Sequence, residues 1–171
     1  MQTVLHPAGI TDTPLLANLV QLYLYDASIL LELDVDERGI FVYAGVDAAS
    51  LLARKLALLI YTRQRLVGFA LVDKASRIHQ PFDGHSITDF FVLRRYRRQG
   101  IGRCAATQIF NTLPGRWEIA SAAANVPAQT FWRSVIDHYT GGHYDELWYQ
   151  TGSWRGPIQS FIAPAAQAVP A

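Results

Sequence analysis

The chain has 171 residues, half of them hydrophobic, and a formal net charge of +1. This length fits one domain with a single core, and the near-neutral charge gives no global field for binding nucleic acid. The single Cys104 excludes an internal disulfide, and the five histidines show no metal-ligand spacing with it, so we expect no metal. The N-terminus lacks a basic stretch followed by an apolar core, and Arg54 and Lys55 interrupt the apolar run at 51–61. We therefore expect a cytoplasmic protein without a membrane segment.

Charge is unevenly divided along the chain. Residues 1–50 contain seven acids and one base, Arg38, a sum of −6, whereas the remainder contains fourteen bases and seven acids, a sum of +7. This partition predicts a basic half for an anionic ligand and an acidic half for a cation.

The first elements expected are a short strand and a helix. Residues Thr3 to His6 form the strand candidate, and residues 11–14 read Thr-Asp-Thr-Pro, which supplies capping residues and a proline suited to the first helical turn. Apolar residues then recur at three- and four-residue spacing to about residue 25. From Asp26 to Gly45 the pattern weakens, and we expect a second short helix and a loop.

Two apolar runs, 56–62 and 66–73, flank a polar turn and predict a hairpin of mostly buried strands. A polar loop, 74–85, leads to the next strand at 87–93. A helical pattern resumes after Gly102 and ends at Pro114-Gly115.

The turn between strand 87–93 and the helix predicts an anion site. Glycines at 100 and 102 let the backbone approach a ligand closely, so N–H groups between Arg98 and Arg103 can bind phosphate oxygens. Five arginines crowd this turn: Arg94, Arg95, Arg97, Arg98 and Arg103. A Walker A lysine and the three-glycine dinucleotide pattern are both missing, which disfavours nucleotide hydrolysis and a Rossmann cofactor. Without the glycine spacing, the cluster would be read as a solvated basic turn.

The remaining elements are a strand at 117–122, a helix from Pro127 to Gly141, and strands at 144–150 and 157–162. The mixed order of strands and helices predicts an α/β domain on one mixed sheet. We expect this domain to span residues 1–162 and residues 163–171 to form a disordered tail.

Two motifs resemble those of the GNAT superfamily of acetyl-coenzyme-A-dependent N-acetyltransferases. Residues 97–102 match its Q/R-x-x-G-x-G/A signature. Asn125, Ala128, Phe131 and Trp132 reproduce its N-x-x-A-x-x-F-Y pattern, with Trp in place of the usual Tyr. The resemblance covers residues 3–162. It implies a single GNAT-like domain with a mixed, mostly antiparallel sheet of about six or seven strands and about four helices, and acetyl-coenzyme A as co-substrate.

The turn and the resemblance together give the expected cofactor-binding residues: Val92, Leu93, Arg97, Arg98, Gln99, Gly100, Ile101, Gly102, Arg103, Asn125, Phe131 and Trp132. Strands 87–93 and 117–122 are expected to splay and admit the pantetheine arm, and a backbone N–H near Val92 to polarise the thioester carbonyl. By resemblance Asn125 contacts the pantetheine, although it also fits a helix cap. Phe131 also fits a core position.

Asp89 lies inside an apolar strand and is the expected general base, because a carboxylate can accept the proton of an alkylamine directly or through water. A structural role for Asp89 stays open, and Glu118 and His85 are weaker alternatives. In many relatives the tyrosine that Trp132 replaces donates a proton to the leaving thiolate, which an indole N–H cannot do. Tyr139, Tyr144 or Tyr43 would substitute, or the thiolate would leave unassisted.

The predicted function is direct acetyl transfer to a primary amine of a small, cationic acceptor, without a covalent enzyme intermediate. Two alternatives remain: a module that binds acyl-coenzyme A without turnover, and a nucleic-acid-binding protein that uses the arginine turn. The second is disfavoured because the basic residues are confined to one turn. Cys104 is expected to pack in the core. The acceptor and a possible homodimer are left undetermined by the sequence.

Overall fold

The computed structural model describes residues 2–42, 48–152 and 154–165. The strands are β1 Thr3–Pro7, β2 Leu56–Thr62, β3 Arg65–Asp73, β4 His85–Val92, β5 Gly115–Ala120, β6 Asp145–Thr151 and β7 Trp154–Ala163. The α-helices within these ranges are α1 Thr13–Leu31, α2 Ala48–Arg54, α3 Ile101–Thr112 and α4 Val126–Thr140.

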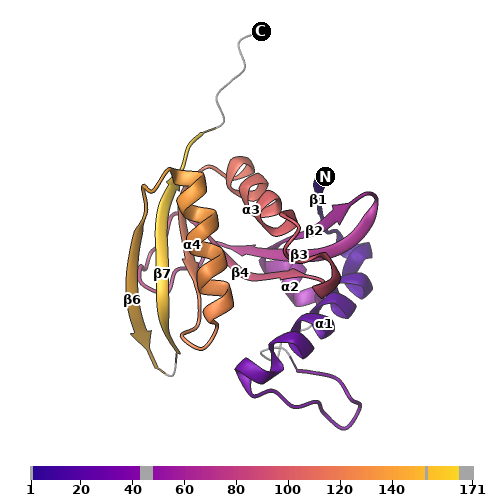
Figure 1. Cartoon of the computed structure of the whole chain (residues 1–171). Coiled ribbons are helices and arrows are strands. Elements are labelled where there is room, and N and C mark those ends of the chain that lie inside the picture. The colour runs from indigo at the N-terminus through magenta and orange to yellow at the C-terminus, as the bar shows by residue number, and fades with distance from the viewer. Residues whose placement is uncertain (1, 43–47, 153, 166–171) are drawn as a thin grey trace.

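All seven strands form one sheet in the order β1-β2-β3-β4-β5-β7-β6 (Figure 1). Neighbouring strands are antiparallel except β4 and β5, which are parallel and joined through α3. The predicted single α/β domain with a mixed, mostly antiparallel sheet is confirmed.

Helices cover both faces of the sheet. α1 and α2 pack on one face of β2 and β3, where Leu59, Phe69 and Leu71 belong to one apolar cluster. α3 and α4 pack on the opposite face, around Phe110 and Trp117. Because β2 and β3 are buried on both sides, their apolar residues run without the alternation that a half-exposed strand shows.

The N-terminal helix differs from the prediction. α1 does not stop near residue 25 but continues to Leu31, where Glu32 adopts a left-handed φ of 51°. The prediction of a separate short helix between Asp26 and Gly45 is wrong over residues 26–42, and residues 43–45 lie outside the described residues. Residues 27–31 are mostly good helix formers, and the acidic Asp26 that suggested an end is instead held by two arginines. By length and composition the segment Ile10–Leu31 could cross a membrane, yet four of its apolar residues are buried on the sheet: Leu16, Leu19, Val20 and Leu24.

The element that sequence reasoning missed is α2, since only its Leu51 is buried and seven residues give too short a period to recognise. The other predicted strands and helices are present with ends shifted by up to three residues, the largest shift being the start of β7 at Trp154. β7 extends to Ala163, which pairs with Gly115. The predicted tail falls largely on residues 166–171, which lie outside the described residues.

β4 is the strand that shapes the site. It pairs with β3 along its length, but with β5 only at His85–Trp117 and Ser86–Glu118. Beyond Ser86 the two strands part. A register shift opposite Leu71 and Val72 adds one residue to β4 at Thr88, so Asp89 faces the α1 side of the sheet together with Phe91.

Candidate active site

Within the described residues, the parting of β4 from β5 leaves backbone N–H groups of β4 without a strand partner. The N–H of Leu93 donates to the carbonyl of Val67 at 2.8 Å. Because hydrogen-bonded and non-bonded positions alternate in an antiparallel ladder, Phe90 and Val92 point their N–H groups away from β3, toward β5. Over this stretch β5 has already diverged, so both donors face the opening that the sequence predicted.

The turn after β4 has the backbone shape of an anion site. Arg98 and Gly100 have left-handed φ values of 59° and 80°, an alternation that turns successive N–H groups toward one side. α3 begins at Ile101 without any side-chain cap, so its first N–H groups remain as donors and its dipole favours a negative charge. This geometry fits a pyrophosphate.

Only part of the arginine cluster is available to such a ligand. The guanidinium groups of Arg94 and Arg97 both donate to Asp26 on α1, with Arg94 Nε 2.5 Å from Oδ1, and Arg97 Nε also donates to the Val92 carbonyl at 2.7 Å. Burial alone would raise the pKa of Asp26, but these hydrogen bonds lower it below its usual range. In the described part of the chain, Arg98 and Arg103 form no ion pair with a carboxylate, so their charges can face a phosphate.

Gly102 lies against the aromatic side chains between β4 and α4. A Cβ atom at this position would come within 3.2 Å of the Phe131 ring. Phe131 stacks on Phe90 at 5.6 Å between ring centroids, and Trp132 packs edge-on against both rings. Phe131 is half-buried and Trp132 is buried, so both predicted cofactor contacts are also packing residues.

Asn125 caps α4, the structural role that its place before Pro127 suggested. Its side-chain oxygen accepts the backbone N–H of Ala128 at 3.1 Å, and Val126 and Pro127 then open the helix. Asn125 follows the end of β5 by five residues, and its capping role leaves the predicted contact with the pantetheine untested.

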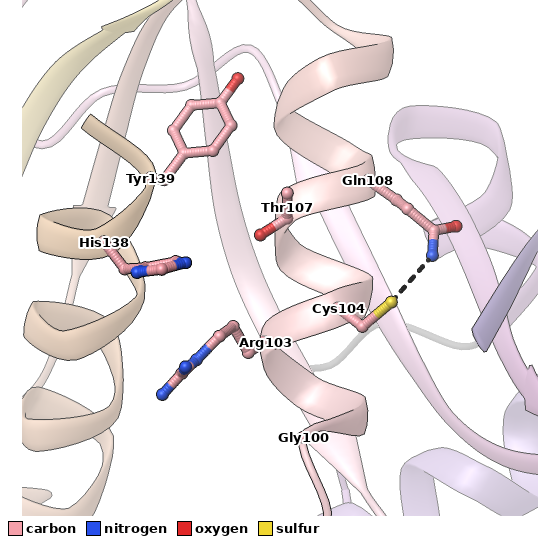
Figure 2. A pocket seen from close by; sticks show the side chains of 7 residues that line it. All are labelled: Gly100, Arg103, Cys104, Thr107, Gln108, His138 and Tyr139. Carbon is pink, nitrogen blue, oxygen red and sulfur yellow. Dashed lines mark hydrogen bonds between the residues drawn. The ribbon is translucent and has the colours of Figure 1, made fainter. Parts of the chain in front are cut away.

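A hollow between α3 and α4 adjoins the phosphate turn. It has a volume of about 390 Å³ and is lined by Gly100, Arg103, Cys104, Thr107, Gln108, His138 and Tyr139. Figure 2 shows the side chains of Arg103 and His138 between α3 and α4. On the opposite side of α3, Cys104 accepts a hydrogen bond from Gln108. Cys104 is half-buried, so it is not the fully buried core residue that was expected.

Asp89 lies in a polar cluster on the α1 face, and it is only 5% exposed. Thr88 Oγ1 donates to its carboxylate at 2.8 Å, Lys55 Nζ lies 3.9 Å away, and the Tyr23 hydroxyl donates a further bond. Lys55 also donates to Thr88 Oγ1 at 2.8 Å and lies 3.8 Å from Asp73. Burial, and next the charge of Asp89, raises the pKa of Tyr23, so this residue stays a protonated donor.

Sequence reasoning missed Lys55 and Tyr23 as partners of Asp89. Tyr23 comes from α1 and Lys55 is the residue before β2, both far from Asp89 in the chain. Their own local patterns indicate only a helix face for Tyr23 and the end of an apolar run for Lys55. The cluster lies about 10 Å along β4 from Val92, as three residues of strand imply.

The alternative acids and bases lie elsewhere. Glu118 is buried, accepts a 2.5 Å bond from Ser76 Oγ, and pairs with Ser86 at the closed end of the β4–β5 opening, about 20 Å along β4 from Val92. His85 packs against Trp117 at the same end, with the two rings tilted by 39°, and burial followed by the charge of Lys74 lowers the pKa of His85. Both positions make these residues poor partners for chemistry near Val92.

The tyrosines proposed to replace Trp132 are also remote or undescribed. Tyr139 donates to Asn111, nine residues along α3 from Gly102, which corresponds to about 13 Å of helix. Tyr144 packs against the apolar cluster around Phe110 and Trp117. Tyr43 lies outside the described residues. Within those residues, no group of three or more His, Cys, Asp or Glu side chains is arranged to hold a metal ion.

The comparisons with known proteins fit this geometry. The model of the acetyltransferase (GNAT) family matches residues 29–135, more than half of the chain. The chain belongs to this family. GNAT membership assigns it acetyl transfer and the binding of acetyl-coenzyme A, and the matched segment contains β4, the phosphate turn and the aromatic residues at Gly102. No curated protein matches the chain in sequence.

Several solved structures share the GNAT fold. An acetyltransferase from Thermus thermophilus has 16% identity and a TM-score of 0.66, with 95% of this chain and 97% of that chain covered. The ribosomal-protein-S18-alanine N-acetyltransferase from Escherichia coli has 14% identity and a TM-score of 0.58, covering 98% and 99%. The protein yncA from Salmonella typhimurium, solved with its cofactor acetyl-CoA, has 12% identity and a TM-score of 0.56, covering 100% and 99%.

Proposed function

We propose that the protein is a cytoplasmic N-acetyltransferase that moves the acetyl group of acetyl-coenzyme A to a primary amine of a small, cationic acceptor. The observation that carries the proposal is the opening between β4 and β5, with the Phe90 and Val92 N–H groups facing it and an uncapped helix start at one end. The thioester and pantetheine of the cofactor would lie along the opening, and its pyrophosphate would lie at the start of α3.

The residues of the turn would hold the cofactor by its phosphates. The backbone N–H groups from Arg98 to Arg103 supply donors with fixed directions, and the Arg98 and Arg103 side chains add positive charge. Arg97 would act chiefly through its backbone, because its guanidinium already contacts Asp26 and the Val92 carbonyl. The hollow beside Arg103 and His138 has room for the nucleotide end.

Acetyl-coenzyme A supplies a thioester that an uncharged amine can attack. The amine nitrogen bonds to the acetyl carbon, the carbon–sulfur bond breaks, and the nitrogen loses a proton. The Val92 N–H would donate to the carbonyl oxygen as negative charge develops on it. Asp89 would take up the amine proton through a bound water or the Tyr23 hydroxyl, since its own carboxylate is nearly covered. No acidic side chain is needed for the thiolate, because the thiol pKa near 8.5 makes it an acceptable leaving group.

The acidic residues favour a cationic acceptor. Asp89 and Asp73 lie on the α1 face with Lys55 between them, and Glu32 and Asp34 are exposed just after α1. Asp26 and Asp36 are less available, because arginines already hold them.

The test is turnover across a panel of polyamines, aminosugars, amino acids and peptides, read as release of free thiol. Asp89→Asn should reduce the transfer rate by at least tenfold, most severely at pH values where the amine is protonated. The matched control is Asp73→Asn, which removes the same charge at a similar distance from Lys55 but keeps the proposed proton path. An Asp89→Asn enzyme with the wild-type pH profile would refute the role of Asp89, and turnover of uncharged acceptors alone would refute the acceptor class.

The second candidate is a module that binds acyl-coenzyme A without turnover. The observation that favours it is the buried Trp132 in place of a tyrosine, while the Tyr139 hydroxyl is bonded to Asn111 near the other end of α3 from Gly102. Thermal stabilisation by coenzyme A without thiol release for any amine would support this candidate over the enzyme.

A further inference from the structure

The β6 strand is an exposed edge with apolar side chains on both faces. It lies at one border of the sheet beyond β7, and α4 runs in front of β7 without covering β6 (Figure 1). Leu147 is 53% exposed and Trp148 is 58% exposed, although neighbouring residues of a strand point to opposite faces. Large apolar residues exposed on both sides of an edge strand indicate a surface that another strand covers.

The other border of the sheet does not have this character. β1 has five residues and ends at Pro7, which cannot donate a hydrogen bond, so it is blunted in the way edge strands usually are. β6 has seven residues and contains neither proline nor lysine.

The backbone of β6 presents three residues outward. The N–H of Ser121 donates to the Pro157 carbonyl, so Pro157 and every second residue of β7 point toward β5. The intervening β7 residues therefore bond to β6, at Tyr149, Leu147 and Asp145. It follows that Glu146, Trp148 and Gln150 direct their N–H and carbonyl groups to the open side.

We propose that β6 pairs antiparallel with β6 of a second copy of this chain, with the two-fold axis at Trp148. In this register Trp148 meets Trp148 of the partner on the α4 face, and the outward groups of Glu146 meet those of Gln150. On the opposite face Leu147 meets Tyr149, an aliphatic–aromatic cross-strand pair. The two sheets become one continuous sheet through an isologous contact.

Charge selects this register from its alternatives. A two-fold axis at Glu146 would oppose two glutamates, and an axis at Gln150 would shorten the paired segment by moving Glu146 past the end of the partner strand. At the proposed axis no carboxylate opposes another, because Asp145 faces Thr151 and Glu146 faces Gln150. Glu146 is further neutralised within its own chain, since Arg133 donates to both of its oxygens at 2.7 Å and Gln159 donates at 2.6 Å. The hydrogen bond from Arg133 is the main reason that the pKa of Glu146 is lowered.

Sedimentation of the full chain tests the association. The 19.1 kDa chain should behave as a particle of twice that mass at micromolar concentrations. Trp148→Lys should yield the monomer, because it would place two charges together at the axis. Ile162→Lys is the control, because Ile162 is 68% exposed on β7 but lies outside the paired segment. A monomeric wild-type chain, or a Trp148→Lys chain that stays dimeric, would overturn the proposal.

Cross-linking tests the register independently of Trp148→Lys. Two Cα atoms at a hydrogen-bonded antiparallel pair lie about 5.5 Å apart, which suits a disulfide. When diamide accepts the two electrons, Trp148→Cys should therefore form a covalent dimer. Gln150→Cys should not, because the two copies of residue 150 would be about 13 Å apart. Both variants retain Cys104, so wild type gives the background. Cross-linking of Gln150→Cys rather than Trp148→Cys would refute the proposed register.

Discussion

Gly100 occupies a backbone conformation that L-residues rarely adopt, at the point where the phosphate would approach. Its φ is 80°, and an added Cβ would meet nothing within 4 Å, so a substitution brings backbone strain and fills space outside the protein. Gly100→Val should lower the affinity for coenzyme A at least tenfold, because the side chain would stand where the ligand lies. Calorimetry measures this.

Gly39→Val is the matched control for that change. Gly39 has a φ of 73° and equally open surroundings, so it carries the same strain, but it lies in the loop after α1. If both valine variants bind coenzyme A as wild type does, the turn does not contact the ligand backbone as proposed.

Trp132 should contribute through packing rather than through proton donation. It is buried between Phe90 and Phe131, and its indole N–H has no useful acidity. Trp132→Phe should therefore keep most of the transfer rate. Trp132→Ala should lose more of that rate, and its free energy of unfolding should fall by roughly 3 kcal/mol or more. A thousandfold rate loss in a folded Phe variant that still binds coenzyme A would contradict this.

At the level of elements, Asp26 fastens α1 to the turn that follows β4. Its pKa is lowered in the folded chain, so it contributes stability that is present above the usual carboxyl pKa near 4 and is lost as pH falls through the lower folded value. Asp26→Asn should accordingly be less stable than wild type at pH 7, and the difference should shrink toward pH 2. Urea unfolding at a series of pH values measures it, and a constant difference would show that Asp26 acts by packing alone.

Local sequence patterns explain which elements could be predicted, and long-range contacts such as that of Asp26 explain which could not. Strands such as β2 and β3 were predictable because a buried strand must be apolar along its length. The end of α1 was not, because Asp26 looks like a helix terminator until Arg94 and Arg97, some seventy residues later, neutralise it. The phosphate turn is encoded locally by its glycines, whereas the cluster of Asp89 with Lys55 and Tyr23 depends on long-range packing.

For the whole molecule, the division of charge predicts a salt effect on the acceptor. If exposed acids after α1 attract a cationic amine, raising the ionic strength should raise the Michaelis constant for that amine. Glu32→Gln and Asp34→Asn should do the same, with little effect on coenzyme A binding. Asp36→Asn should raise the Michaelis constant for the amine less, because Arg38 already pairs with Asp36. Steady-state kinetics that respond equally to all three changes would contradict the proposed attraction.

The parting of β4 from β5 also has a consequence for hydrogen exchange. A central strand usually has its amide protons protected on both sides. In the described part of this chain, however, the Phe90 and Val92 N–H groups have no strand partner, while Leu93 donates to Val67. We expect alternate amides of β4 to exchange with deuterium at different rates, fast at Phe90 and Val92 and slow at Phe91 and Leu93. Coenzyme A should slow the exchange of the Phe90 and Val92 amides, so binding in the opening would be visible as a change in the exchange rates of β4 alone.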